Sequence, residues 1–205
     1  MSDFTYEKEN NNSVLETYEW DNVWWEHTEN TTAKRVVYIG DSISCGTRGF
    51  GTKLSDNKIL FDGFGTSKAL DNPYFKDSLS LFINQEKKLD AILFNNGLHG
   101  WHQSAEEYNK KYGEMIEFIK SISNAPIFIV LTTNLVNDVE RNKIVIKRNE
   151  IAKKYADKFG LKVIDLYSTS VEYSNLHSED GVHFVYEGYE KLAETILKKL
   201  NYNGI

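Results

Sequence analysis

Ser42 follows a short apolar stretch that ends at a glycine, in the sequence Val36-Val37-Tyr38-Ile39-Gly40-Asp41-Ser42. A stretch of this kind predicts a strand that stops just before a hydroxyl group. Open α/β sheets bind ligands at the carboxyl ends of their strands, so Ser42 is expected where a ligand can reach it. A serine hydroxyl becomes a good nucleophile only when a base takes its proton and a third group orients that base. The rest of the chain must therefore supply a base and an acid.

His183 is the histidine whose surroundings best suit the base. It lies in the sequence Glu179-Asp180-Gly181-Val182-His183-Phe184, three residues after an aspartate. A turn at Gly181 would let the Asp180 carboxylate fold back and hold Nδ1–H of the imidazole, while Nε2 faces the serine. A lone Asp-x-x-His is usually an ordinary surface loop. Together with Ser42 at a strand end, the pair predicts a Ser-His-Asp catalytic triad.

Other reactive side chains have plainer interpretations. His99 and His102 have a spacing that could hold a metal on a helix, but no Cys, Asp or Glu cluster accompanies them, so no metal site is expected. Cys45 would need a base of its own to act as a nucleophile, and core packing is the expected role. Arg48 and Lys68 could bind an anionic substrate group, although solvated surface is the usual place for such residues.

Strand-like and helix-like segments alternate along the chain, which predicts a parallel sheet with helices on both faces. The expected strands cover residues 35–39, 58–62, 90–94, 127–131 and 162–166. The expected helices follow at 74–85, 108–122, 145–159 and 189–200, and a glycine-rich, irregular helix opens after Ser42. Residues 62–67 are expected to form a loop.

Length and composition favour a single enzyme-sized domain. The chain has 205 residues, enough for one full core. A net charge of -6 argues against a nucleic-acid partner, because phosphate contacts need clustered Lys and Arg. No apolar run approaches the ~18 residues of a membrane span. The polar N-terminus and the single cysteine, Cys45, predict a cytoplasmic protein, with a removed leader as the alternative.

The first 33 residues are predicted to form an N-terminal arm and an aromatic cap. Residues 1–12 are expected to be a loose arm, followed by an aromatic patch made of Tyr18, Trp20, Trp24 and Trp25. The patch is interpreted as a cap on the core of the domain at 34–205. A homodimer contact and a wall of a substrate cleft are the alternatives.

The two blocks Gly40-Asp41-Ser42-Ile43-Ser44 and Asp180-Gly181-Val182-His183 resemble those of the SGNH (GDSL) hydrolase superfamily. The resemblance spans roughly residues 35 to 200. It implies a flavodoxin-like, three-layer α/β/α sandwich with a five-stranded parallel sheet. It also implies that Ser42 is the nucleophile, His183 the general base and then acid, and Asp180 its orienting partner. Asp41 is structural in this motif.

The resemblance further implies an oxyanion hole with three donors. The first is the backbone N–H of Ser42, and the second is a glycine N–H after the second strand, for which Gly65 is preferred over Gly63. The third is normally an Asn in a G-x-N-D block, where this chain has Asn95-Asn96-Gly97-Leu98-His99-Gly100. Asn95 is the first choice for this donor and His99 its rival.

The function predicted from these observations is hydrolysis of a carboxylic ester without a cofactor, through an acyl-enzyme. Acetyl groups on a carbohydrate are the first choice of substrate, with Trp101 as a sugar-stacking residue and Arg48 as a second substrate contact. A lipid esterase or lysophospholipase and an acyl-thioesterase are the enzyme alternatives. A carbohydrate-binding module that keeps the fold without turnover is the alternative outside enzymes.

Overall fold

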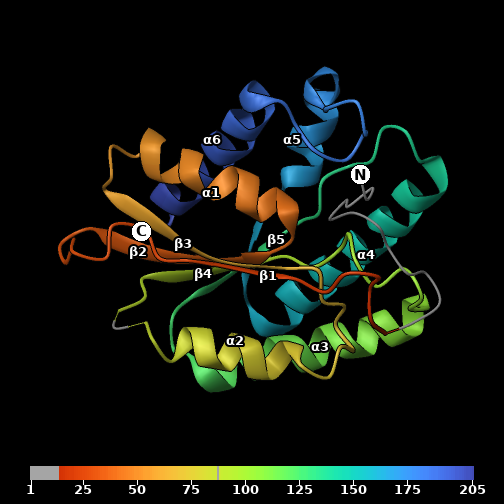
Figure 1. Cartoon of the computed structure of the whole chain (residues 1–205), viewed down its shortest axis with the longest axis horizontal. Helices are drawn as coiled ribbons and strands as arrows, with labels where there is room; N and C mark the ends of the chain where they lie inside the picture. Colours follow the sequence, from red (N-terminus) through yellow and green to blue (C-terminus); the bar gives the residue numbers. More distant parts are fainter. Residues whose placement is uncertain (1–13, 87) are drawn as a thin grey trace.

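A computed structural model describes residues 14–86 and 88–205 of the chain. Figure 1 shows a central sheet between two layers of helices, with α1, α5 and α6 on one face and α2 and α3 on the other. The elements are β1 (Asp21–Trp24), β2 (Lys34–Gly40), α1 (Ser42–Leu54), β3 (Ile59–Thr66), α2 (Phe75–Ile83), β4 (Ala91–Phe94), α3 (Ala105–Ile122), β5 (Ile127–Val130), α4 (Val139–Phe159), β6 (Lys162–Ile164), α5 (Leu166–Glu172), the 3-10 helix η1 (Ser174–Leu176) and α6 (Tyr186–Tyr202). The predicted three-layer α/β sandwich is confirmed.

The sheet has six strands in the order β1-β3-β2-β4-β5-β6, one more than the five predicted. Strands β2 to β6 are parallel, and β1 pairs antiparallel with β3 at the edge. All four residues of β1 are exposed, so no alternation of apolar and polar side chains marks it in the sequence. Residues 14–33 therefore add a strand to the sheet of the main domain. The arm predicted for residues 1–12 lies outside the described residues.

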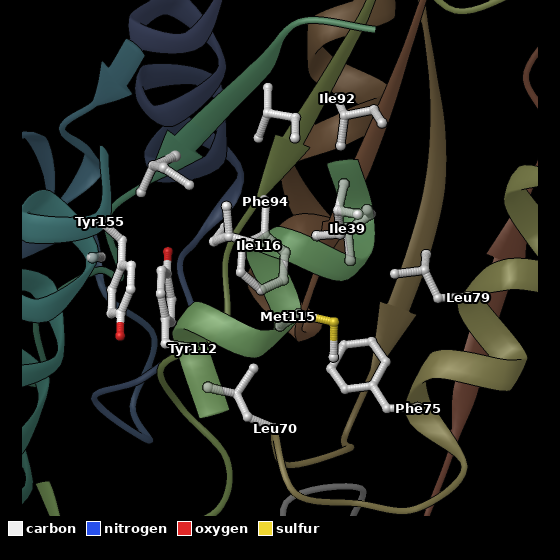
Figure 2. Close-up of a cluster of buried hydrophobic side chains, with 14 of the residues drawn as sticks. Ile39, Leu70, Phe75, Leu79, Ile92, Phe94, Tyr112, Met115, Ile116 and Tyr155 are labelled. Carbon is white, nitrogen blue, oxygen red and sulfur yellow. The ribbon is translucent and has the colours of Figure 1, made fainter. Parts of the chain in front are cut away.

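Alternating side chains of the parallel strands build two cores. Val37 and Ile39 of β2 face the core shared with α2, α3 and α4, and Val36 and Tyr38 face the core shared with α1 and α6. Figure 2 shows the first core, where Ile39 and Phe94 of neighbouring strands lie over Met115 and Ile116 of α3. Because both faces are buried, the strands read as continuous apolar runs. Because these strands pair in parallel, their carboxyl ends lie at one edge of the sheet.

Helix α1 is a regular helix of 13 residues, whereas its glycines predicted an irregular one. Those glycines allow close packing. A side chain at Gly46 would lie 2.3 Å from the ring of Tyr189 in α6, and one at Gly51 would lie 2.6 Å from the ring of Phe61 in β3. Contacts with the neighbouring layers thus offset the low helix propensity of glycine. They also hold α1 against α6 and against the sheet.

The remaining differences concern element ends. Strand β3 continues to Thr66, through residues predicted as a loop, because β1 supplies partners as far as Asp21. Helix α4 starts at Val139 and not at residue 145 as predicted, and α5 and η1 were not predicted. Within the described part of the chain, no helix is long and apolar enough to cross a bilayer.

Candidate active site

Ser42 is the first residue of α1, directly after the N-cap Asp41. The Asp41 carboxylate accepts a hydrogen bond from the Ile43 N–H at 3.0 Å, and its carbonyl accepts one from the Ser44 hydroxyl at 2.6 Å. Asp41 is 3 % exposed, which fits the structural role expected for it. The first N–H groups of a helix have no carbonyl partner within the helix, so the Ser42 N–H is suited to bind negative charge.

The loop from Ser178 to His183 folds around the Asp180 carboxylate. One carboxylate oxygen accepts hydrogen bonds from the Ser178 hydroxyl at 2.8 Å and from the N–H groups of Val182 and His183, both at 2.9 Å. Gly181 adopts φ +72°, a left-handed conformation that a side chain would strain. The turn directs the second carboxylate oxygen at the imidazole.

That second oxygen of Asp180 lies 2.6 Å from Nδ1 of His183, and Nε2 of the same ring lies 2.8 Å from Oγ of Ser42. The three side chains predicted from the sequence thus form one continuous chain of hydrogen bonds. Partial burial acts to raise the pKa of Asp180, but hydrogen bonds from His183 and from the loop hold it well below its usual value. Asp180 is therefore a carboxylate at neutral pH.

Gly65, the predicted second oxyanion donor, lies in β3 opposite Gly40 of β2. It was expected in a loop. A side chain at this position would lie 2.2 Å from Sγ of Cys45, so any larger residue would require the Cys45 side chain to shift. Burial raises the pKa of the Cys45 thiol, which keeps it protonated and agrees with the packing role expected for it.

The side chain of Asn95, first choice for the third donor, turns away toward β5. Its amide nitrogen donates to the carbonyl of Val130 and to the hydroxyl of Thr132, both at 2.9 Å. An amide group has two hydrogens, so these two bonds use them both. The rival, His99, is 2 % exposed, and its Nδ1 lies 3.6 Å from a carboxylate oxygen of Glu16.

Comparison with solved structures gives matches over about four fifths of the chain. A G-D-S-L family lipolytic protein from Veillonella parvula is 21 % identical, with a TM-score of 0.68, and the match covers 82 % of this chain and 99 % of that one. A lipase/acylhydrolase from Enterococcus faecalis is 17 % identical, with a TM-score of 0.67 and coverage of 83 % and 96 %. An acetylxylan esterase from Geobacillus stearothermophilus is 14 % identical, with a TM-score of 0.64 and the same coverage.

The chain has the SGNH (GDSL) hydrolase fold. No family model and no curated protein matches its sequence. The fold places the strand ends that carry Ser42, Gly65 and Asn95 side by side, since β3, β2 and β4 are neighbours in the sheet.

The two predicted substrate contacts are both engaged by other parts of this SGNH fold. The Arg48 guanidinium donates to the Asn22 side chain at 2.6 Å and lies 5.8 Å from the ring centre of Trp24, so it binds to β1. The Trp101 ring has the guanidinium carbons of Arg141 and Arg148 each 4.9 Å from its centre. Stacking of a sugar on Trp101 stays a prediction.

Other charged and aromatic residues near the site pair with neighbouring side chains. Lys68 pairs with Asp21 at 2.6 Å, which neutralises its charge. His102 pairs with Asp71 at 2.8 Å. Across residues 14–86 and 88–205, no three His, Cys, Asp or Glu side chains gather as a metal site. In the aromatic patch, Trp25 packs on Phe82 of α2, at 5.0 Å between ring centres.

Two residues that support the loop after β4 were missed from the sequence. Arg148, 3 % exposed, donates to the carbonyls of Gly97, His99 and Gly100 at 2.6 to 3.0 Å. Glu16 accepts a hydrogen bond from the Gly100 N–H at 3.3 Å. Arg148 falls on the apolar stripe of α4, and a charge on such a stripe is a usable signal. Glu16 lies in a stretch of mixed polar and apolar residues without any such pattern.

Proposed function

We propose that the chain is a serine esterase that hydrolyses small acyl esters, with acetyl groups on a carbohydrate as the preferred substrate. The observation that carries this proposal is the unbroken hydrogen-bond chain from Asp180 through His183 to Oγ of Ser42. A partly buried serine at a helix start rarely meets an oriented imidazole unless the hydroxyl is a nucleophile. The same geometry speaks against a binding module, which needs no such relay.

In the proposed reaction, Ser42 attacks the acyl carbonyl while His183 takes the hydroxyl proton. Asp180 holds the correct tautomer and stabilises the imidazolium that forms. The oxyanion is held by the N–H groups of Ser42 and Gly65 and by a side chain from residues 95–99. His183 then gives its proton to the leaving alcohol. Water, activated by the same imidazole, releases the acid, and no step requires a cofactor.

The choice of an acetylated carbohydrate rests on two supports. The acetylxylan esterase from Geobacillus stearothermophilus shares the fold. In addition, Trp101 places an aromatic ring beside the loop that follows β4. The lipase/acylhydrolase from Enterococcus faecalis has the same fold, so a lipid ester is the second candidate. The fold alone does not distinguish these substrates.

The test compares p-nitrophenyl acetate, butyrate and octanoate with acetylated xylo-oligosaccharides, for the wild-type protein and for Ser42→Ala. We expect release from acetate and from the oligosaccharides that disappears in Ser42→Ala. Absence of any Ser42-dependent hydrolysis would contradict the esterase proposal. A strong preference for octanoate would retain the esterase and overturn the acetyl substrate.

A further inference from the structure

A second imidazole, outside the proposed triad, is buried against a carboxylate from the N-terminal segment. The side chains of His99 and Glu16 are 2 % and 6 % exposed, and Nδ1 of the imidazole lies 3.6 Å from the carboxylate oxygen. Removing an ionisable pair from water costs free energy, which offsets the attraction between the two groups. Stabilisation of the fold alone therefore does not explain why this pair is buried. Buried ionisable groups of this kind concentrate at functional sites.

His99 is held by contacts from two separate segments, helix α4 and the N-terminal segment. Its backbone carbonyl accepts a hydrogen bond of 2.7 Å from Arg148 of α4. The next N–H, of Gly100, donates to the same Glu16 oxygen that faces the ring. The indole of Trp20 meets the ring edge-on, with ring centres 6.2 Å apart and planes at 80°. Since Glu16 faces Nδ1, the other nitrogen, Nε2, lies on the opposite side of the ring.

Trp20 also places His99 close to the other candidate oxyanion donors. An atom of its indole lies 3.5 Å from the point where a side chain at Gly65 would begin. Gly65 is the last residue but one of β3, and His99 follows β4. These two strands lie on either side of β2, which leads into Ser42. One indole that touches both flanks must lie near the start of α1. The loop carrying His99 therefore borders the space in front of Ser42.

We propose that His99 is the third oxyanion donor and that Glu16 is the positioning residue that orients it. This inference rests on the proposed esterase function. A carboxylate facing Nδ1 stabilises the imidazolium form of His99, which carries hydrogens on both nitrogens, so that Nε2–H donates to the developing oxyanion. Glu16 and Trp20 of the N-terminal segment thus border the active site, whereas Glu19 anchors the segment from outside it.

The test is the kinetics of Glu16→Gln beside a matched control, Glu19→Gln, with p-nitrophenyl acetate. Glu19 lies in the same segment and anchors it through Ser67 and Asn72, at 2.9 Å each. Glutamine at position 16 keeps an acceptor for the Gly100 N–H but loses the charge. We expect Glu16→Gln to lower kcat on the order of tenfold with KM within twofold, a fraction of what a lost oxyanion donor costs.

Glu19→Gln is expected to keep kcat within twofold, although it lowers the melting temperature. His99→Asn supplies the donor usual in this fold and should make the further change Glu16→Gln ineffective. The positioning role of Glu16 would be overturned if Glu16→Gln kept the wild-type kcat, or if Glu16→Gln and Glu19→Gln lost kcat equally. Absence of any Ser42-dependent ester hydrolysis would instead contradict the proposed esterase function itself. The two proposals therefore fail on different results.

Discussion

The loop that carries Asp180 and His183 and the loop that carries Asn95 to Gly100 both belong to the proposed active site but are held in different ways. The first folds on its own hydrogen bonds, because Asp180 binds Ser178, Val182 and His183 within the loop. The second depends on groups far away in the sequence: Glu16 lies 84 residues from Gly100, and Arg148 lies 48 residues from it. Local sequence therefore encodes the triad loop, and tertiary structure encodes the other.

The largest effect is expected from Asp180→Asn, which disturbs the loop that is held locally. The amide would donate to Nδ1 and leave the hydrogen on Nε2, so His183 could no longer accept the Ser42 proton. We expect kcat to fall by up to about 10⁴-fold, measured on p-nitrophenyl acetate. The control Ser178→Ala removes one hydroxyl from the same carboxylate and should cost less than about tenfold. Equal losses in both variants would show that loop folding, rather than the tautomer, is what matters.

The second effect concerns the loop that is held from a distance. Arg148→Met removes the donor of three buried carbonyls, and unsatisfied buried groups cost free energy. We expect the free energy of unfolding to fall by about 3 kcal/mol, measured by urea denaturation. Arg141→Met is the matched control, because Arg141 lies at the same 4.9 Å from the Trp101 ring as Arg148 and lies on the same helix. It should lose no more than about 1 kcal/mol. Similar losses in both variants would contradict the clamping of residues 97–100 by Arg148.

The smallest effect is a pH dependence of stability that arises in the triad loop. The folded pKa of Asp180 lies below its usual value, so the folded state favours the carboxylate. Its contribution is present above the usual carboxyl pKa and is lost as the pH falls below it. Because the Asp180 side chain is 47 % exposed, solvent screening keeps the contribution small. The free energy of unfolding of the wild-type protein and of Asp180→Asn would be measured by denaturation at pH 7 and at pH 3. We expect the wild-type protein to be the more stable at pH 7 and to lose this advantage at pH 3. An advantage that grows toward low pH would contradict this sign.

The same contrast explains which parts of the molecule could be predicted from the sequence. The buried strands β2, β4 and β5 and the amphipathic α6 were located to within a few residues, because apolar spacing encodes them. Strand β1 was missed because its exposed residues carry no pattern and form a strand only beside β3. Its pairing also explains why Gly65 lies in a strand and not in a loop.

The residues of the candidate site also differ in whether the sequence around them predicts their contacts. The spacing of Asp180 and His183 predicted their contact because the turn at Gly181 closes it locally. The third donor could not be decided between Asn95 and His99, since the contact that engages Asn95 comes from β5 and the contact that orients His99 comes from Glu16. Neither partner is visible in the residues around the motif.

The most direct test of the central claim is to trap the acyl-enzyme. The protein would be mixed with p-nitrophenyl acetate, quenched in acid within the first turnover, and digested for peptide mass spectrometry. We expect one acetyl group on the peptide that contains Ser42, located on that residue by fragmentation and absent from Ser42→Ala. Acetyl transfer to Cys45 instead, or hydrolysis by Ser42→Ala at the wild-type rate, would contradict Ser42 as the nucleophile.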